Sequence, residues 1–538
     1  MTRNLPTGRL LLWCLLVLAL AFAAWLRIAD TLARPLWLDE GYSAYIADRD
    51  FAWIWRIVPQ FETHPPFYYS LLRVWTLLFG DALAIRRALG ILAGLATIPV
   101  AALGIREIGR LIGWSSLRTQ VAMAVAMLLV ALAPLMIEMD RQVRPYAVLI
   151  LAHAVALTLI LRIGRIAAEE RRIAAWPFAS YLVVLAMLLW LHNLAVLSGG
   201  ALGLSSLVLL AGRGLTRRDW LTFWVGHGLV GLCYLPGLLI LLDQASGWTA
   251  ATWLKFDLGT LPWDLSRLFG TPGRPGLILS LLLGASGFAA LLRTREGWRV
   301  ALVLAMTALL PILLSIAISL AKSPVFLPRT LSATTVPAVM LLAIGVAGAR
   351  GYWRWPVGVA LLLMLALLVR IDLHEFRQRP QQDWYGAAAW LDAHVAPGDE
   401  VWAYPNDAAL PLHYAAHDRG YAKVIAALRP QPTPVPTLDA GPGAAYPTGN
   451  RGVVTLSPER LRALVAAPAV ERVPRIWLLR MGRDMFDRAD DFPAAFAGWH
   501  LVQRCESHPI EIRGYARAST TGAIAATARC AAGVNPRR

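Results

Sequence analysis

Residues 119–164 contain two apolar runs joined by a short polar turn, and they read TQVAMAVAMLLVALAPLMIE, MDRQVR and PYAVLILAHAVALTLILRIG in succession. A helix needs about 20 mostly apolar residues to cross a hydrocarbon core that is about 30 Å thick. Two runs of this length in direct succession therefore predict two membrane-spanning helices with a polar turn between them.

The composition of the whole chain supports this interpretation. Of its 538 residues, 57% are hydrophobic and 16% are charged, whereas soluble proteins average about 45–50% apolar and about 25% charged residues. These values exclude a string of ordinary soluble domains and a disordered or fibrous protein. The net charge is +17, but only three of the 51 basic residues are Lys. We interpret this charge as loop arginines of a membrane protein, not as a nucleic-acid surface.

Nine further apolar runs raise the predicted number of spans to eleven. They lie near residues 9–28, 84–105, 176–193, 195–211, 220–242, 276–293, 299–320, 330–349 and 354–371. The first run could instead be a signal peptide, but it is longer than the usual h-region of about 7–15 residues, which favours an uncleaved span. We predict an all-α polytopic membrane domain over residues 1–371 and a small α/β domain over residues 372–538.

The arginines of the short loops predict the orientation. They recur in alternate loops, which places the N-terminus in the cytoplasm and the C-terminal domain outside. This pattern requires that the apolar segment Pro65 to Gly80 does not span. Its 16 residues would make a helix of about 24 Å, and Arg73 interrupts it. We expect a helix at the outer membrane surface.

The C-terminal domain shows a helix and several short strands in its pattern. Asp383 to Val395 predicts an amphipathic helix, and Pro397-Gly398-Asp399 predicts a turn before a strand at Glu400–Tyr404. Other strand candidates are Gly452–Leu456, Arg475–Leu479 and His500–Gln503. Arg429–Asn450 is rich in Pro, Gly and Thr and predicts a long loop. No catalytic motif is present here, so a lid, a docking surface or a packing role all remain open.

The four cysteines fall into two pairs. Cys505 and Cys530 lie in the predicted outer domain, where a disulfide is permitted, and both the bonded and the free state remain open. Cys14 and Cys233 lie within predicted spans, where we expect them to be buried apolar side chains.

An acidic pair follows the first span, in Pro35-Leu36-Trp37-Leu38-Asp39-Glu40-Gly41. An acid at the membrane edge and beside aromatic rings is partly desolvated, which makes its carboxylate a better base. Asp39 and Glu40 are therefore candidate catalytic residues. The alternative is an ordinary solvated pair of loop acids.

Three other outer segments carry candidate site residues. His64 stands before two prolines and Tyr69, a pattern that also suits a helix start in an aromatic belt. Asp140 and Arg144 lie in the turn after residue 138, where ionisable groups at membrane depth are costly, although an ion pair that caps two helices is the alternative. Lys322 and Arg329 suit a phosphate, or could extend to lipid headgroups.

Together these features predict chemistry on an amphiphile with a phosphate head at the outer surface. The sequence contains no Walker loop, no dinucleotide glycine fingerprint and no clear cluster of metal ligands. A nucleotide-driven pump is therefore disfavoured, and no cofactor is predicted, although a divalent metal stays open.

The pattern resembles the GT-C class of integral-membrane glycosyltransferases. The similarity is to the bacterial branch related to protein O-mannosyltransferases, lipid A aminoarabinose transferases and lipopolysaccharide-core galacturonosyl transferases. It covers residues 1–371 well and the C-terminal domain loosely. The motifs that carry it are Trp37 to Glu40, His64 to Tyr69, Arg144-Pro145-Tyr146, His192 at a span end, and Pro324 to Arg329.

The resemblance implies transfer of a sugar from a polyprenyl-phosphate donor to a lipid, polysaccharide or protein acceptor at the periplasmic face of a bacterial inner membrane. Asp39 would activate or orient the acceptor hydroxyl, with Glu40 beside it and inversion at the sugar. Arg144, Lys322 and Arg329 would neutralise the phosphate. One departure concerns the second acid: Gln142 stands where many relatives have Glu, so Asp140 is a weaker candidate.

Three other functions remain open. A secondary transporter or lipid flippase also carries charges within the membrane, but the matching halves with broken helices that such proteins commonly show are missing here. A surface-polysaccharide polymerase or ligase would use similar donors and differ in its acceptor. A scaffold with a decayed site is the third alternative.

Overall fold

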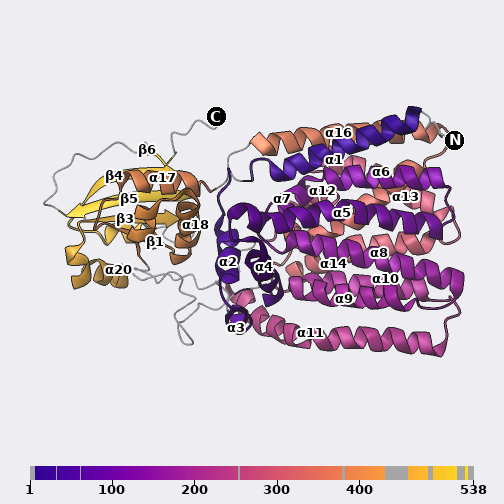
Figure 1. Ribbon diagram of the computed structural model, residues 1–538, viewed down its shortest axis with the longest axis horizontal. Coiled ribbons are helices and arrows are strands. Elements are labelled where there is room, and N and C mark those ends of the chain that lie inside the picture. Colours follow the sequence, from indigo (N-terminus) through magenta and orange to yellow (C-terminus); the bar gives the residue numbers. More distant parts are fainter. Residues whose placement is uncertain are drawn as a thin grey trace. The chain divides into compact units, whose positions relative to one another are not determined.

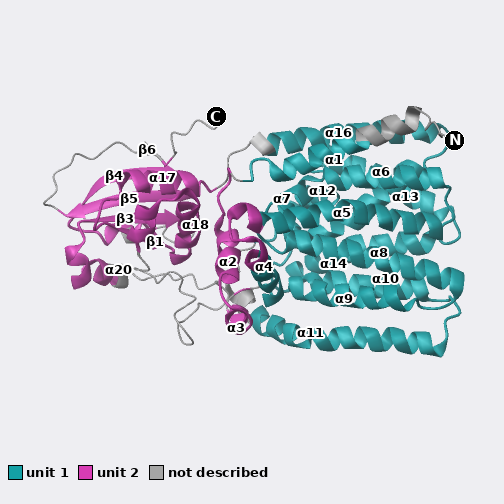
Figure 2. Ribbon diagram, viewed as in Figure 1, with its two compact units in different colours: residues 1–31, 63–75, 87–377 teal, residues 32–62, 76–86, 378–538 magenta. Residues whose placement is uncertain are grey.

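A computed structural model describes most of the chain. The segments that it leaves undescribed are residues 1–6, 32, 61, 63, 252–254, 378–381, 430–457, 483–488, 518–527 and 531–538. Contacts divide the chain into two compact units (Figure 2). The first comprises residues 1–31, 63–75 and 87–377, and the second comprises residues 32–62, 76–86 and 378–538.

The first unit is a bundle whose long helices run side by side (Figure 1). Its elements are α1 (Thr7–Ile28), most of α4 (Pro66–Phe79), α5 (Leu83–Leu111), α6 (Ser116–Ala131), α7 (Pro134–Asp140), α8 (Tyr146–Glu170), α9 (Ala175–Leu191), α10 (Ala195–Leu210), α11 (Arg217–Ala251), α12 (Leu261–Leu268), α13 (Arg274–Leu292), α14 (Gly297–Ala321), η2 (Pro328–Thr334), α15 (Thr335–Gly348), η3 (Gly351–Trp353) and α16 (Arg354–Arg377).

Among the described residues, seven helices are long and apolar enough to cross a membrane, and a bent pair raises this number to eight. The chain is therefore a multi-pass membrane protein. All eleven predicted runs lie largely in helices, and α9 (Ala175–Leu191) and α10 (Ala195–Leu210) are among the shorter apolar ones. The predicted total of eleven spans thus remains a prediction.

The predicted span over residues 119–138 is not one straight helix. It divides into α6 and α7, which meet at an angle of 59°. Pro134 begins α7, and proline has no N–H to continue the hydrogen-bond ladder of the preceding helix, so the break occurs there. The short helix α7 then leads directly into the polar turn that carries Arg144.

The segment Pro65 to Gly80 forms the 14-residue helix α4. A helix of this length extends about 21 Å and falls short of a bilayer core of about 30 Å. It is not among the helices long enough to span, in agreement with the prediction that this segment does not cross.

The second unit joins the helices of the loop after α1 to the C-terminal domain. The loop contributes α2 (Leu38–Ala47), α3 (Phe51–Ile57) and η1 (Val58–Gln60). The C-terminal part contains α17 (Trp384–His394), β1 (Glu400–Tyr404), η4 (Asn406–Ala408), α18 (Ala409–Arg419), α19 (Ala422–Ala427), β2 (Leu428–Arg429), α20 (Pro458–Val465), η6 (Pro468–Arg472), β3 (Arg475–Met481), α22 (Asp491–Ala494), β4 (Trp499–Ser507), β5 (Ile510–Arg517) and β6 (Ala528–Arg529).

The strands form one mixed sheet in the order β2-β1-β3-β5-β4-β6. Strand β1 pairs in parallel with β2 and β3, whereas β5 is antiparallel to both β3 and β4. The small α/β domain predicted from the sequence is therefore present. The strand candidate Gly452–Leu456 and most of the predicted loop Arg429–Asn450 lie outside the described residues.

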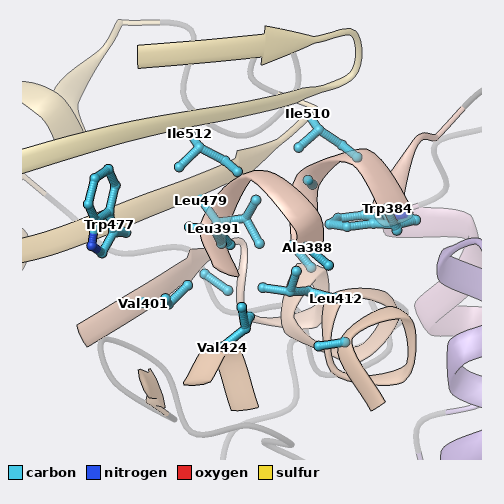
Figure 3. Close-up of a cluster of buried hydrophobic side chains, with 14 of the residues drawn as sticks. Trp384, Ala388, Leu391, Val401, Leu412, Val424, Trp477, Leu479, Ile510 and Ile512 are labelled. Carbon is cyan, nitrogen blue, oxygen red and sulfur yellow. The ribbon is translucent and has the colours of Figure 1, made fainter. Parts of the chain in front are cut away.

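The sheet has a hydrophobic core on each face. On one face, Trp384 and Leu391 of α17 pack with Trp477 and Leu479 of β3 (Figure 3). Helix α17 begins where predicted, because the Asp383 side chain accepts a hydrogen bond of 2.9 Å from the N–H of Gly386. Burial of one helix face then attaches α17 to the sheet.

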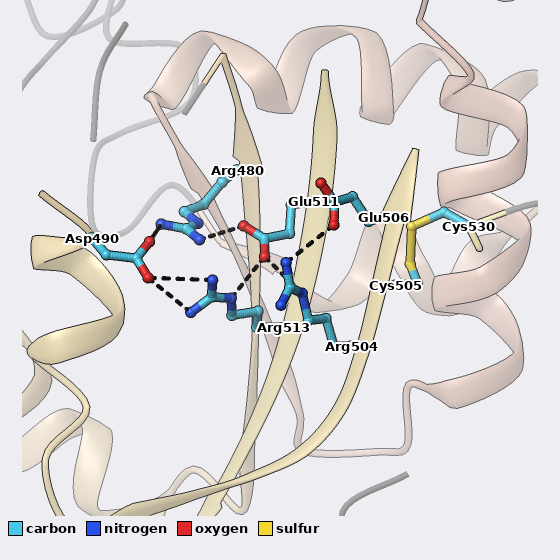
Figure 4. Close-up of polar contacts among 8 residues, drawn as sticks. All are labelled: Arg480, Asp490, Arg504, Cys505, Glu506, Glu511, Arg513 and Cys530. Carbon is cyan, nitrogen blue, oxygen red and sulfur yellow. Dashed lines mark hydrogen bonds and ion pairs between the residues drawn. A yellow bond between two sulfur atoms is a disulfide. The ribbon is translucent and has the colours of Figure 1, made fainter. Parts of the chain in front are cut away.

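Cys505 and Cys530 form a disulfide across 25 residues (Figure 4). In the chain-entropy model, a loop of this length contributes about 3 kcal/mol to the stability of the domain. Cys233 is exposed on α11, so its predicted burial is wrong. Only 22% of the apolar window of α11 is buried, because this helix lies at the periphery of the bundle. The side chain of Cys14 lies outside the described part.

Candidate functional site

A buried ion pair joins α1 to the end of α7. Nε of Arg27 donates to Oδ2 of Asp140 at 2.8 Å, and neither side chain is exposed. The Arg27 Nη1 also donates to the carbonyl oxygens of Ala131 at 2.8 Å and Ala23 at 3.1 Å. Ala131 is the last residue of α6, so Arg27 binds both sides of the bend between α6 and α7.

Two glycines of α5 make room for Asp140. A Cβ atom added at Gly94 would lie 2.1 Å from Cγ of Asp140, and one at Gly90 would lie 2.7 Å from its carbonyl oxygen. Both distances are far below van der Waals contact. The close approach of α5 therefore fixes the Asp140 carboxylate in contact with the α5 backbone.

Arg27 is not among the site residues predicted from the sequence. An arginine inside an apolar run is itself a signal, since a charge at membrane depth requires a partner. The turn after Asp140 has a second link to α1, because Nη2 of Arg141 lies 3.7 Å from the Asp30 carboxylate and donates to the Ala29 carbonyl at 3.3 Å.

Arg144 lies in a buried cluster of rings just beyond this turn. Its Nη2 is 3.2 Å from both ring nitrogens of His64, and its Cζ is 5.9 Å from the centroid of the Tyr146 ring. The ring of His64 meets that of His192 edge to face, with centroids 4.7 Å apart. Arg144 is fully buried, and the three rings are nearly so.

This cluster combines segments that are far apart in the sequence. His64 precedes α4, Arg144 lies between α7 and α8, and His192 caps the end of α9. The Nδ1 of His192 accepts a hydrogen bond of 3.0 Å from the Leu194 N–H, which places the proton of a neutral ring on Nε2. Tyr69, from α4, is also fully buried. Through its N–H donors, the Arg144 guanidinium is the group of this cluster that suits an anion.

The remaining predicted cations, Lys322 and Arg329, follow the C-terminal end of α14. Lys322 is exposed where α14 ends, and Arg329 is half-buried in η2. The Ser319 hydroxyl accepts hydrogen bonds from the N–H groups of Val325 and Phe326 and so shapes the turn between them. Because η2 packs against α7 and α8, Arg329 belongs to the same end of the bundle as Arg144.

Asp39 and Glu40 lie in the second unit, in the first turn of α2. The Trp37 N–H donates to Oε2 of Glu40 at 3.2 Å, so Glu40 caps the helix. Acids in a first helical turn are stabilised by the helix dipole. Both side chains are buried, with Glu40 1% and Asp39 7% exposed. Glu40 thus has a structural role at the start of α2.

The C-terminal domain supports the helix that carries Asp39. Leu38 packs against the core of that domain, and its N–H donates to Oε1 of Gln382 at 3.2 Å. A Cβ atom added at Gly41 would lie 3.4 Å from the Pro411 nitrogen, so α2 and α18 approach closely. Of the three roles left open for this domain, packing against the outer loop is the one that these contacts show.

Asp48, just after α2, is the second point of attachment. Its carboxylate accepts from Nη2 of Arg86 and from the Tyr414 hydroxyl, both at 2.7 Å. Burial and the adjacent Asp48 charge raise the pKa of Tyr414 well above its usual value, so this phenol stays protonated and continues to donate.

Metal ligands do not gather in the described part of the chain. There, no group of three or more His, Cys, Asp or Glu side chains lies in an arrangement that could hold an ion. His64 and His192 are neighbours, and their contacts include Arg144, each other and Tyr146.

No family model matches the chain, and no curated protein matches it in sequence. Solved structures match over nearly its whole length. ArnT from Cupriavidus metallidurans in the apo state has a TM-score of 0.56 at 15% identity, over 93% of this chain and 97% of that one. The same protein bound to undecaprenyl phosphate has a TM-score of 0.57 at 15% identity, over 95% and 98%. The chain thus has the fold of the GT-C membrane glycosyltransferases.

Proposed function

We propose that this chain, which has the GT-C fold, transfers a sugar from a polyprenyl-phosphate donor to an acceptor in the cell envelope. The observation that carries the proposal is the buried Arg144, held among His64, Tyr146 and His192 at one end of the bundle. One solved structure with this fold was bound to undecaprenyl phosphate. A buried arginine is suited to hold such a phosphate through its paired N–H donors.

The proposed reaction is a single displacement with inversion. The Asp39 carboxylate takes the proton of the acceptor hydroxyl while the oxygen of that hydroxyl attacks the anomeric carbon of the donor sugar. The bond between that carbon and the phosphate oxygen breaks, and the polyprenyl phosphate leaves as an anion. Arg144 and Arg329 stabilise the charge that develops on the leaving oxygen, so no separate strong acid is required. Lys322, which is exposed, meets the same phosphate as the donor enters.

The other site residues have supporting roles in this proposal. Glu40 caps α2 and so orients Asp39. His64 and His192 hold the Arg144 guanidinium, and Tyr69 and Tyr146 line the donor site. We assign Asp140 a positioning role through its ion pair with Arg27, in place of the catalytic role considered from the sequence. The reaction would take place at the periplasmic face of a bacterial inner membrane, with a lipid, glycan or protein as acceptor.

Asp39→Asn tests the proposal. We would compare envelope glycolipids and glycoproteins by mass spectrometry in a strain with the native gene, a strain without it, and a strain with Asp39→Asn at equal protein level. We expect one glycan mass to disappear in both altered strains, because the amide cannot accept the hydroxyl proton. That mass would identify the sugar and the acceptor.

Asp257→Asn is a matched control. Asp257 is an exposed acid of an outer loop whose Oδ1 accepts a hydrogen bond from the Gly259 N–H, and an asparagine preserves this contact. The control should restore every product. If Asp39→Asn also restores every product that the deletion removes, the proposed base is wrong and a transport function becomes the better explanation.

A further inference from the structure

Four exposed arginines gather at two neighbouring turns of the helical bundle. Arg293 and Arg295 lie in the turn between α13 and α14, and Arg350 and Arg354 lie in the turn between α15 and α16. None of them has a place in the proposed reaction. We call these four residues the arginine cluster.

Close helix packing brings the two turns together. A Cβ atom added at Gly348, the last residue of α15, would lie 2.3 Å from Cβ of Ala290, near the end of α13. Helix α13 also packs against α16. Because Arg293 and Arg350 follow this contact by only two or three residues, the arginines of both turns border one surface.

Positive charge is in excess on this surface. Glu296 is the one acidic residue in the sequence stretches 293–299 and 349–355. Its two carboxylate oxygens accept from Nη1 and Nη2 of Arg213, at 2.9 and 2.6 Å. The Glu296 carboxylate is thus paired with Arg213, which is not one of the four arginines. The arginine cluster therefore keeps a net positive charge.

Exposed aromatic rings lie beside the arginines. Tyr352, Trp353 and Trp355 are 73%, 57% and 81% exposed, and Trp298 in the other turn is 49% exposed. Rings of this kind favour the interface between lipid tails and water, where an apolar face and a polar edge are both satisfied. The aromatic rings therefore place the arginine cluster at the depth of lipid headgroups.

The cluster and the candidate site lie at opposite ends of the bundle. Helix α14 begins at Gly297, beside the cluster, and its 25 residues end just before Lys322 and η2. A helix of 25 residues is about 37 Å long, which exceeds a bilayer core of about 30 Å. The two surfaces therefore meet opposite leaflets.

We propose that the arginine cluster binds the phosphate of an anionic phospholipid in the leaflet opposite the candidate site. Guanidinium groups from two turns can hold one phosphodiester by paired N–H donors. The aromatic rings pack along the glycerol and the upper acyl chains. Basic surfaces between membrane helices recognise lipid headgroups in this way.

Native mass spectrometry of the full-length protein in detergent tests the proposal. The probes are phosphatidylglycerol and phosphatidylcholine with identical acyl chains, and glycerol 3-phosphate as a soluble headgroup. We expect the native chain to prefer phosphatidylglycerol. Each arginine near a headgroup contributes about 5-fold in affinity, so Arg350→Gln/Arg354→Gln should weaken binding of that lipid about 25-fold.

Arg217→Gln/Arg218→Gln is the control of equal charge. Both arginines are exposed at the start of α11, beside Asp219, and they lie outside the cluster. This variant should bind phosphatidylglycerol like the native chain. Arg293→Gln/Arg295→Gln should weaken binding of phosphatidylglycerol by the same factor as Arg350→Gln/Arg354→Gln. The proposal thus remains testable if one of these two variants misfolds.

Four outcomes would overturn the proposal. Two of them are equal binding of the two lipids by the native chain, and full binding of phosphatidylglycerol by both cluster variants. The third is a loss of phosphatidylglycerol binding in the control that equals the loss in the cluster variants. The fourth is competition by glycerol 3-phosphate at the same concentration at which phosphatidylglycerol binds. The last outcome would identify a site for soluble phosphates. None of these outcomes bears on glycosyl transfer, which the Asp39 experiment tests separately.

Discussion

Two buried arginines of the bundle, Arg27 and Arg144, have different surroundings. Arg27 meets the carboxylate of Asp140 and two backbone carbonyls. Arg144 meets the rings of His64 and Tyr146. A buried cation that is paired with a carboxylate has its charge satisfied within the protein, and it acts as structure. Arg144 is the buried cation that the proposed reaction assigns to the donor phosphate.

A double-mutant comparison tests whether the Arg27–Asp140 pair has a structural role. Arg27→Met should destabilise the chain by about 3–5 kcal/mol, because it leaves a buried carboxylate without its cation. Arg27→Met/Asp140→Leu should recover most of this loss, as measured by thermal unfolding in detergent. If Asp140 only positions the turn, the double variant also recovers product formation. A stable double variant without activity would make Asp140 a catalytic residue.

Gly94 gives a second prediction at this scale. Gly94→Ala places a methyl group 2.1 Å from Cγ of Asp140, and overpacking of this kind costs about 1–3 kcal/mol. We expect a lower midpoint of thermal unfolding. The control is Gly203→Ala in α10, where a Cβ meets nothing within 4 Å. The control should be neutral or stabilised by about 0.5–1 kcal/mol. Equal effects in the two variants would show that α5 does not confine Asp140.

At the scale of elements, the C-terminal sheet depends on a buried polar network. Arg480 of β3 pairs with Glu511 of β5 and, at 2.6 Å, with Asp490, and Arg513 also donates to Glu511 (Figure 4). Arg480 and Glu511 are direct partners in the strand register. Charged side chains thus continue the pairing of β3 and β5 beyond the hydrophobic core.

This network predicts how the domain responds to acid. Burial favours a raised pKa for Glu511, but Arg480 and Arg513 outweigh it, so the pKa is lowered. The stabilisation is therefore complete above the ordinary carboxyl pKa of about 4.3, and it is lost as the pH falls through the lower folded value. Limited proteolysis of the full chain from about pH 7 down to about pH 3 should show a progressive loss of resistance in the C-terminal domain.

Glu511→Gln should make that response to pH shallower, because the amide does not titrate. Glu459→Gln is the control, since the Glu459 side chain is 78% exposed and lies outside the network of Glu511. The control should follow the native curve. A native curve that Glu511→Gln leaves unchanged would show that other carboxylates determine the acid response.

In the whole molecule, the loop after α1 belongs with the C-terminal domain. Residues 32–62 and 76–86 form one compact unit with residues 378–538. Within it, α2 is attached through Leu38, Gly41 and Asp48 to Gln382, Pro411 and Tyr414. The domain that carries no catalytic motif thus supports the helix that carries Asp39.

A chain that ends at Arg377 tests this dependence. It retains Asp39, Arg144 and every predicted span, so it should insert and purify as a monodisperse bundle. We expect it to form no glycosylated product, because α2 has lost its partners. Tyr414→Phe in the full chain removes a single hydrogen bond to a charged group, worth about 1.5–3 kcal/mol, and should reduce product only in part. Full activity of the shortened chain would refute this dependence.

The sequence by itself determined the helices of the bundle and several elements of the C-terminal domain. Each of the eleven apolar runs lies largely in helices, and Glu400–Tyr404 is a strand with the predicted bounds. These features depend on hydrophobic periodicity within 5 to 25 residues, which is a local property of the chain. Strand β5 was missed, although Ile510 and Ile512 alternate with Glu511 and Arg513 as in a strand.

The polar residues that meet are brought together by tertiary packing. Arg27 and Asp140 are 113 positions apart, His64 and Arg144 are 80 apart, and Leu38 and Gln382 are 344 apart. A local pattern cannot encode such pairs, because they depend on how helices pack and on glycines such as Gly94 that let backbones approach. The same reason explains why the sequence indicated that Asp140 needs a partner, but only helix packing identified Arg27 as that partner.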